Sequence, residues 1–430
     1  MPFSTKTTTS SGLGLTGYEY WSNPVGDIES LNLSERSNLV ELDRKVHELW
    51  GLGRNLILAW CAYDRGVKLL VIPHYAIADY ALAKHDDIVS SSGRLPSGDS
   101  QNFVIGLLSG KRQLTLRQIQ NSAKLLGVET EYVGLRQPLS DSPAEAAIID
   151  KLIKRYSVSY VQDRAVALFD IVGFSLLSPF EQMTQLNSLS YSLNSAHSKI
   201  LDRAIDISFA RSSTGDGFYI WNRDRGVTAN TNLYHLMHLV LADNAIARRK
   251  AHGRTVPLLR ACFHVGSCYE FHQAEGLNPT IFSDIVGDVT IELARMIERA
   301  MPGQIFVGEF NAELPLSEDA SADLVSIDSI GFVDRAQENL LQLNGLELSG
   351  EAIQSIKCYL TGRQQSDGTF SVRKLTIHDK HGLSHNVFNA KINIYRAAAE
   401  PILLGIEDRL LRDEELDIQT VEHIIPDSHH

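Results

Sequence analysis

The stretch ALFDIVGFSLLSPFEQM, residues 167–183, decides the fold. It begins as a continuous apolar run, typical of a buried strand, and continues as an amphipathic pattern typical of a helix. Asp170 stands near the end of the apolar run, and Gly173 follows three residues later. A carboxylate in that position costs stability unless something nearby needs its charge. The stretch therefore predicts a buried strand that brings one acid to a functional site.

A second stretch, RSSTGDGFYIW at residues 211–221, predicts a strand, a tight turn and a strand, with Asp216 between two glycines. The glycines allow a hairpin tip to turn sharply and to approach another backbone closely. We expect Asp170 at the edge of the sheet, where a helix starting at residues 171–175 directs backbone N–H groups into the same space. Each acid alone is typical of a helix cap or a turn. Together they predict a site for Mg²⁺ or Mn²⁺ beside a phosphate.

Length and charge restrict the class of protein. A chain of 430 residues predicts two or three domains. A formal net charge of −12 argues against nonspecific binding to nucleic acid or to an anionic membrane, since both depend on clustered Lys and Arg. No apolar run reaches the length of a membrane span, so we expect a cytoplasmic protein. We also expect the four cysteines to be buried, reduced thiols: Cys61, Cys262, Cys268 and Cys358.

The first part of the chain, residues 1–155, reads as a small α/β domain with a structural or regulatory role. It predicts a helix over 34–53, a β-hairpin over 55–75, and helices over 115–127 and 138–156. No catalytic constellation is present in this part.

The second part, residues 160–365, predicts an α+β sandwich with one face of its sheet covered. We expect strands at 165–172, 208–222, 258–271 and 303–309, and helices at 179–207, 229–251 and 285–300.

The third part, residues 366–430, reads as a small β-rich accessory module. It predicts a strand pair over 370–395 around the turn DKHG. Three histidines gather there, His378, His381 and His385, but no cysteine is near, so we expect polar surface rather than a zinc site.

Five motifs in order, ALFDIVGFS, STGDGFYI, FHVG, SDIVGDVTIELARMIERA and PGQIFVGE, resemble the catalytic domain of class III nucleotidyl cyclases. The resemblance covers about residues 160–365 and implies a ferredoxin-like, palm-like core. It implies that Asp170, Asp216 and the backbone carbonyl of Ile171 hold two Mg²⁺ or Mn²⁺ ions. The implied reaction is attack of the ribose 3′-hydroxyl on the α-phosphate, which expels pyrophosphate.

The same resemblance assigns further roles. The amides of Gly173, Phe174 and Ser175 are implied to cradle the triphosphate. Arg295 matches the transition-state arginine of the family, whose rigid guanidinium meets the charge that develops at the α-phosphate. Family members build each site at a dimer interface, so a twofold homodimer with two equivalent sites is expected.

Departures from the family pattern concern the substrate. In adenylate cyclases a Lys and an Asp read adenine. In this chain Ser212 stands at the position of the Lys, and Asp284 stands at the position of the Asp. Ser212 can donate or accept, and Asp284 can accept from cytosine N4 or uracil N3–H. The position of the family's ribose-orienting Asn holds Ile291 in this chain, with Thr290 and Glu292 beside it. The absence of the Asn indicates either that a neighbouring residue orients the ribose or that the site is weakened.

The chain most resembles the pyrimidine nucleotide cyclases of bacterial antiphage signalling, the Pycsar type. Uridylate cyclases are the commoner members of that group, so we expect UTP as substrate and cyclic UMP as a messenger for a separate effector. CTP, ATP or GTP are the alternatives, and so is a catalytically silent nucleotide-binding domain that regulates a partner. The GG(D/E)EF signature of diguanylate cyclases is absent.

Overall fold

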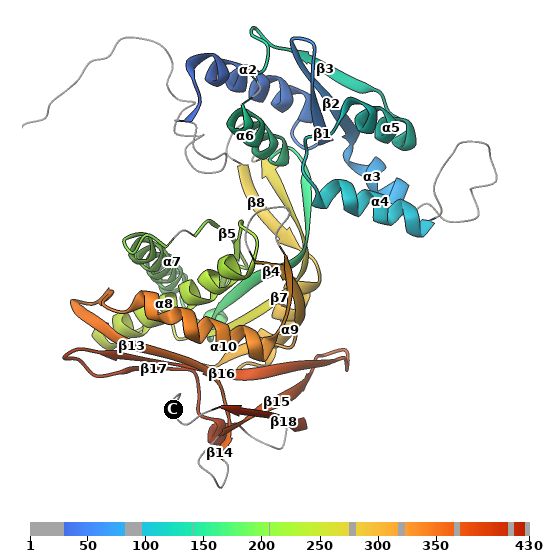
Figure 1. Cartoon of the computed structure of the whole chain (residues 1–430). Helices are drawn as coiled ribbons and strands as arrows, with labels where there is room; N and C mark the ends of the chain where they lie inside the picture. Colours follow the sequence, from blue (N-terminus) through green and yellow to red (C-terminus); the bar gives the residue numbers. More distant parts are fainter. Residues whose placement is uncertain are drawn as a thin grey trace, which may run out of the picture. The chain divides into compact units, whose positions relative to one another are not determined.

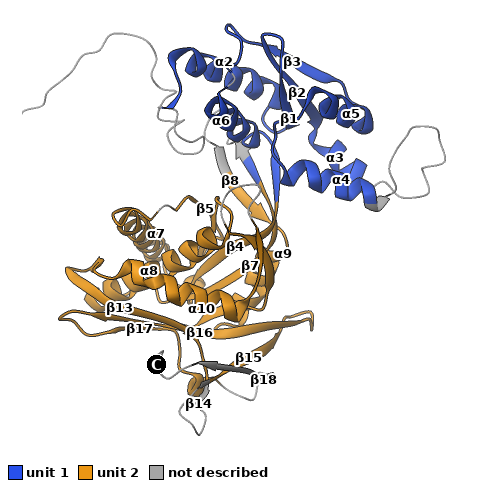
Figure 2. Cartoon of the chain, viewed as in Figure 1, with its two compact units in different colours: residues 1–160, 271–282 blue, residues 161–270, 283–430 orange. Residues whose placement is uncertain are grey.

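The computed structural model describes residues 30–81, 97–140, 142–205, 207–274, 281–316, 323–364, 370–411 and 417–425. The chain forms two compact units, residues 1–160 with 271–282 and residues 161–270 with 283–430 (Figure 2). Within the described ranges, no helix is long and apolar enough to cross a bilayer. All four cysteines are buried, as expected.

Unit 1 is a three-stranded antiparallel sheet with helices packed around it. The strand order is β1 (Asn55–Tyr63), β2 (Gly66–Pro73) and β3 (Thr130–Gly134), and the helices are α2 (Leu33–Trp50), α3 (His74–Ala81), α4 (Ser97–Ser109), α5 (Leu116–Leu126) and α6 (Pro143–Lys154). Apolar residues of α2, β1, β2 and α6 form its core. The predicted hairpin and the predicted helices correspond to β1–β2, α2, α5 and α6. The strand β3 was not predicted, because most of its residues are exposed and it lacks an apolar run.

Unit 2 is built on one large mixed sheet, so it is α+β as expected (Figure 1). The main path of the sheet is β12 (Glu347–Leu348), β13 (Glu351–Leu360), β16 (Ser384–Arg396), β9 (Ile305–Gly308), β7 (Leu259–Ala274), β4 (Val158–Ile171), β6 (Gly217–Asn222) and β5 (Phe209–Ser213). Beside this path lie β8 (Ile281–Val286), β14 (Gly362–Gln364), β15 (Phe370–His378), β17 (Ile402–Leu404) and β18 (Asp417–Ile425). A separate ribbon pairs β10 (Asn311–Pro315) with β11 (Leu324–Asp328).

Helices cover both faces of the large sheet, whereas the sequence predicted one covered face. Phe169 and Ile171 of β4 belong to the core that includes α7 (Pro179–Leu201), α8 (Val227–Lys250) and α10 (Ser329–Asn339). Val166 and Leu168, which point to the other face, pack in a second core with α9 (Asp288–Arg299) and β15. The apolar run of β4 has no polar alternation because both of its faces are buried.

Two helix boundaries differ from prediction for local reasons. The helix α7 ends at Leu201 rather than at residue 207, because the chain turns at Ala204, whose φ is +53°. The helix α9 starts at Asp288 rather than at residue 285. A Cβ at Gly287 would lie 2.8 Å from Cα of Cys268, so the chain turns from β8 into α9 at a position that only glycine can occupy.

The predicted strand pair of the third part is present as β15 and β16. The strand β16 also hydrogen-bonds to β9 and β13, so it lies within the same sheet as the strands of residues 160–365. The functional division into 1–155, 160–365 and 366–430 stays a prediction.

Candidate active site

The two predicted acids lie together, across the pairing of β4 with β6. Asp170 is opposite Gly217 in the register, and the amide of Ile171 donates to the carbonyl oxygen of Asp216 at 2.9 Å. A Cβ at Gly217 would lie 1.8 Å from the carbonyl oxygen of Phe169, so only glycine permits this approach of the two strands. The other glycine of the tip, Gly215, has a φ of +97°. The backbone geometry of the GDG turn therefore requires glycine at both positions.

The Asp170 side chain is buried, and the residue is 7% exposed. It lies at the carboxyl end of an interior strand instead of at the edge of the sheet, because β7 and β6 flank β4 on either side. Burial raises the pKa of its carboxyl, the guanidinium of Arg260 opposes that rise, and the neighbouring Asp216 carboxylate adds to it. A buried carboxyl with a second carboxylate beside it forms a site that favours a cation.

Arg260 on β7 is a site residue that the sequence analysis missed. Its Nε donates to Oδ2 of Asp170 at 2.6 Å, and its Nη1 donates to the carbonyl oxygen of Ala300 at 3.0 Å. The available signal was a lone arginine in the apolar strand LLRACFHV, since such a charge requires a partner. The sequence did not show which acid that partner is.

The expected phosphate cradle is a short turn rather than the start of a long helix. Gly173 has a φ of +69°, and the residues after it form the 3₁₀ helix η4 (Phe174–Leu176). The long helix α7 begins later, at Pro179, after Ser178 caps it. The first N–H groups of a helix have no acceptor within it, so the amides of Phe174 and Ser175 are available to an external acceptor.

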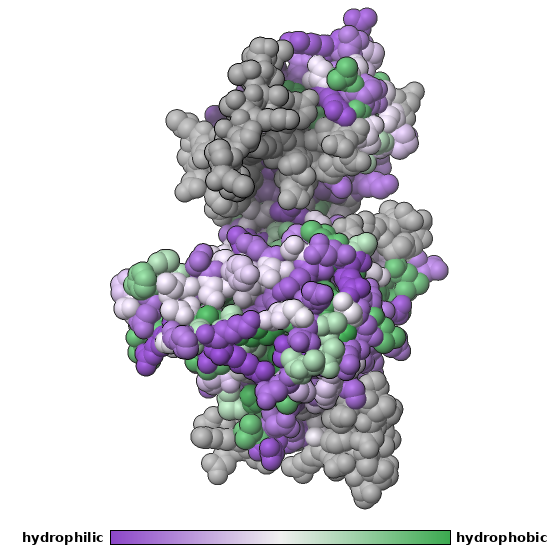
Figure 3. All heavy atoms as spheres, turned by 90° about the vertical axis from the view of Figure 1, so that its left-hand side faces the viewer, coloured by the Kyte–Doolittle hydropathy of each residue, from purple (hydrophilic) through white to green (hydrophobic). Residues whose placement is uncertain are grey.

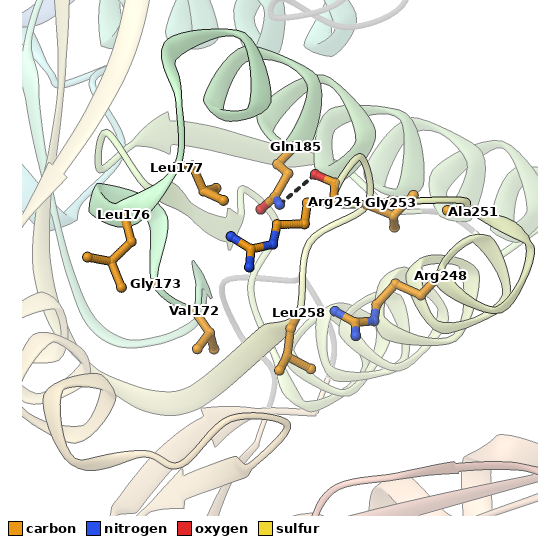
Figure 4. Close-up of a pocket in the computed structure, with 11 residues that line it drawn as sticks. Val172, Gly173, Leu176, Leu177, Gln185, Arg248, Ala251, Gly253, Arg254 and Leu258 are labelled. Carbon is orange, nitrogen blue, oxygen red and sulfur yellow. Dashed lines mark hydrogen bonds between the residues drawn. The ribbon is translucent and has the colours of Figure 1, made fainter.

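A pocket of about 300 Å³ lies beside this turn (Figure 4). Val172 and Gly173 form part of its wall, and Arg248 and Arg254 turn their guanidinium groups into it. The side-chain amide of Gln185 donates to the carbonyl oxygen of Arg254 at 2.9 Å and so fixes the loop that carries this arginine. Neither acid of the pair lines the pocket, which is therefore a basic hollow next to the acids and not their binding cleft.

The two residues predicted to read the base are in direct contact. Oγ of Ser212 donates to Oδ1 of Asp284 at 3.0 Å, although 72 residues separate them in the sequence. The same Oδ1 also accepts from the amide of Ile285 at 2.9 Å. Both side chains are partly buried. Asp284 Oδ2 is therefore the oxygen of this pair that is left for a base donor.

The three candidates for the ribose-orienting group have different surroundings. Ile291 is 54% exposed on α9. Oγ1 of Thr290 hydrogen-bonds to the backbone of Gly287 and caps the helix. Glu292 accepts from Nδ1 of His385 at 2.8 Å. Thr290 and Glu292 are thus already engaged, and the exposed position is apolar.

Arg295 lies on α9 and forms an ion pair with a residue of the β15–β16 turn. Its Nε is 3.2 Å from Oδ2 of Asp379, whose side chain is fully buried. The prediction that the three histidines form polar surface is wrong for His385. That residue is 9% exposed, because it packs against Glu292 of α9, while His378 and His381 are exposed.

The acid pair fits a divalent cation by its chemistry. Carboxylate oxygens are the ligands that Mg²⁺ and Mn²⁺ prefer, and a cation would relieve the repulsion that helps to raise the pKa of Asp170. In the part of the chain that the structure describes, no group of three or more His, Cys, Asp or Glu side chains is placed to hold a metal. A cation at Asp170 and Asp216 would therefore depend on backbone oxygens, such as that of Ile171, and on oxygens of a bound phosphate.

No known family model and no curated protein matches this sequence. Among solved structures, the chain is similar to the guanylyl cyclase Cya2, at 12% identity and a TM-score of 0.30, over 54% of this chain and 92% of that one. It is also similar to the adenylyl cyclase CyaB from P. aeruginosa, at 14% identity and a TM-score of 0.25, over 40% of this chain and 94% of that one. A bacterial light-regulated adenylyl cyclase matches at 12% identity and a TM-score of 0.26, over 42% of this chain and 98% of that one. Similarity at this level does not assign an activity, which has to rest on the site itself.

Proposed function

We propose that the chain is a nucleotidyl cyclase that converts UTP to 3′,5′-cyclic UMP and pyrophosphate. The observation that carries the proposal is the meeting of Asp170 and Asp216 beside Arg260 and the turn at Gly173. A buried acid with a second, partly exposed acid beside it, next to a cation and free backbone amides, is what a triphosphate with its metal ions requires.

The proposed reaction forms a bond between the ribose 3′-oxygen and the α-phosphorus. The bond from that phosphorus to the bridging oxygen breaks, pyrophosphate leaves with the electron pair, and the hydroxyl proton passes to solvent. Divalent metal, held by Asp170 and Asp216, would supply charge neutralisation at the phosphates. The chain itself orients the triphosphate through the amides after Gly173 and meets the developing charge with Arg260 and Arg295.

A homodimer is part of the proposal, because the resemblance places Arg295 of one subunit in the site of the other. Apolar side chains are exposed on η4 and α7. Leu176, Phe180, Met183 and Tyr191 are 84%, 70%, 53% and 68% exposed. Figure 3 shows hydrophobic groups scattered among hydrophilic ones on the left-hand side of Figure 1, where α7 lies. Single exposed apolar side chains are normal on a protein surface, so the homodimer rests on the resemblance.

The pyrimidine base and the antiphage role come from the resemblance stated above. The contact between Ser212 and Asp284 adds a physical reason for a base with a donor, because Asp284 Oδ2 can only accept. Uracil N3–H and cytosine N4 both satisfy it, and so do the amino groups of adenine and guanine, so CTP, ATP and GTP remain the alternatives. The cyclic product would act as a messenger for a separate effector.

A silent nucleotide-binding domain is the second candidate function. It is favoured by the surroundings of α9, since Ile291 is apolar and both of its polar neighbours are engaged elsewhere. A chain without an orienting group can bind nucleotide and turn it over slowly or not at all.

Incubation of the purified chain with each of the four nucleoside triphosphates and Mn²⁺, followed by mass identification of the products, tests the proposal. Cyclic UMP is expected, and Asp170→Ala and Asp216→Ala should each abolish it while the dimer persists by light scattering. Asp408→Asn, which removes a different carboxylate, should keep the activity. Full activity in either of the first two variants would refute the role of the acid pair, and binding without product would support the silent domain.

A further inference from the structure

One hydrogen bond and two ion pairs connect the β15–β16 hairpin to one face of α9. Nδ1 of His385 lies 2.8 Å from Oε2 of Glu292, and Nε of Arg295 lies 3.2 Å from Oδ2 of Asp379. A third pair, Lys380 with Glu298, is longer and exposed, at 3.8 Å. The helix residues 292, 295 and 298 are spaced by three, which places them on neighbouring turns of one face. Asp379 and Lys380 are opposite in charge to Arg295 and Glu298, so the hairpin matches the face of α9 that carries Arg295.

Asp379 is held rigidly in the turn before it contacts Arg295. Its Oδ1 accepts from the amides of His381 and Leu383 at 2.8 and 2.9 Å. Burial alone would raise the pKa of this carboxyl, but those two amides and the Arg295 guanidinium outweigh it, and the pKa is lowered. The group is therefore an ionised carboxylate at neutral pH, with one oxygen fixed by the backbone. Its Oδ2 lies 3.2 Å from Nε of the arginine, an ion pair without hydrogen-bond geometry.

The contact to Arg295 is made at Nε. A guanidinium that is held at Nε keeps its two Nη groups, which carry four of its five N–H donors, directed beyond the carboxylate. The Arg295 side chain is 22% exposed, while that of Asp379 has no exposed surface. The carboxylate of Asp379 is thus covered, while part of the Arg295 side chain is accessible.

We propose that Asp379 is a positioning residue for Arg295, and that the β15–β16 hairpin serves the proposed cyclase reaction by holding this guanidinium ready for the triphosphate. The inference rests on the proposed function, and it gives the third part of the chain a role in that reaction. An arginine on a long flexible side chain is an efficient transition-state group only when its conformations are restricted beforehand.

A double-mutant cycle tests this inference. Steady-state kcat and KM are measured with the triphosphate that gives most product, in saturating Mn²⁺, for wild type, Asp379→Asn, Arg295→Ala and the double variant. Asn at residue 379 keeps a side-chain acceptor for the two turn amides but loses the charge. We expect kcat to fall about 10- to 100-fold in Asp379→Asn, with KM within about twofold of wild type. The double variant should match Arg295→Ala, because Asp379 acts only through that arginine.

The matched control is Asp408→Asn, which breaks the buried pair between Arg373 and Asp408, 2.6 Å apart, in the same part of the chain. It should lower the melting temperature about as much as Asp379→Asn and leave kcat unchanged. The inference is overturned by wild-type kcat in Asp379→Asn, by equal kcat losses in Asp379→Asn and Asp408→Asn, or by a further loss in the double variant beyond Arg295→Ala. An active wild type with any of these results refutes the positioning role alone, whereas a wild type that forms no cyclic product refutes the proposed function and this inference with it.

Discussion

Replacing Gly217 with alanine should separate the two acids of the candidate site. The new Cβ would lie 1.8 Å from the carbonyl oxygen of Phe169 and 3.2 Å from Cα of Asp170. An ordinary contact of this kind is about 3.4 Å or longer, so β6 has to move away from β4 by more than about an ångström. That movement acts on the strand pair that places Asp216 next to Asp170.

The magnitude follows from the bonds at the hairpin tip. Separation weakens the bond from the Ile171 amide to Asp216, 2.9 Å, and the adjacent pairing of Asp170 with Gly217. At about 1 kcal/mol each, with strain added, the free energy of unfolding should fall by about 2–4 kcal/mol. Displacement of one metal ligand by about 1 Å should lower kcat about 100-fold.

Urea denaturation followed by circular dichroism measures the first effect, and product formation in Mn²⁺ measures the second. The control is Gly106→Ala in α4, where a Cβ meets nothing within 4 Å. This helical substitution should be neutral or stabilise by up to about 1 kcal/mol, with activity unchanged. A Gly217→Ala chain with the urea midpoint and kcat of wild type would show that the close approach of β4 and β6 does not position the acids.

Four further outcomes are expected. Mn²⁺ at 100 times its dissociation constant should stabilise the wild type by about 2.7 kcal/mol and leave the melting temperature of Asp216→Asn unchanged; equal shifts would place the metal elsewhere. The pKa of Asp170 is raised in the folded state, so its ionisation opposes folding as the pH rises past the ordinary Asp pKa of about 3.9. Without metal, Asp170→Asn should therefore melt above wild type at pH 7, and the difference should vanish below about pH 3; a variant that melts lower at pH 7 would contradict this sign. Ile291→Asn should raise kcat if the site lacks only its ribose-orienting group, and an unchanged product yield with tight nucleotide binding would favour the silent domain. Burial raises the pKa of Tyr219 to about 12, and its Oη donates to the carbonyl oxygen of Thr290 at 3.2 Å; Tyr219→Phe should remove one phenolate transition near that pH in an ultraviolet titration and cost about 1 kcal/mol of stability.

Local sequence patterns predicted much of the fold. The apolar run through Phe169 indicated a buried strand, and the glycines around Asp216 indicated a tip that meets another backbone. Apolar periodicity predicted six of the helices that the structure describes, α2, α5, α6, α7, α8 and α9. These predictions succeeded because propensity, periodicity and turn chemistry are set within a few residues.

The sequence by itself determined which acids were candidates, and it identified Arg295 and the pair Ser212 and Asp284 through a family resemblance. Only the tertiary structure decided the partners of these groups: Arg260 for Asp170, Asp379 for Arg295, and a covering helix on the second face of the sheet. The physical reason is that strand order and register are settled by nonlocal packing, so a charge in an apolar strand shows that it needs a partner without indicating which of 52 acidic residues supplies it.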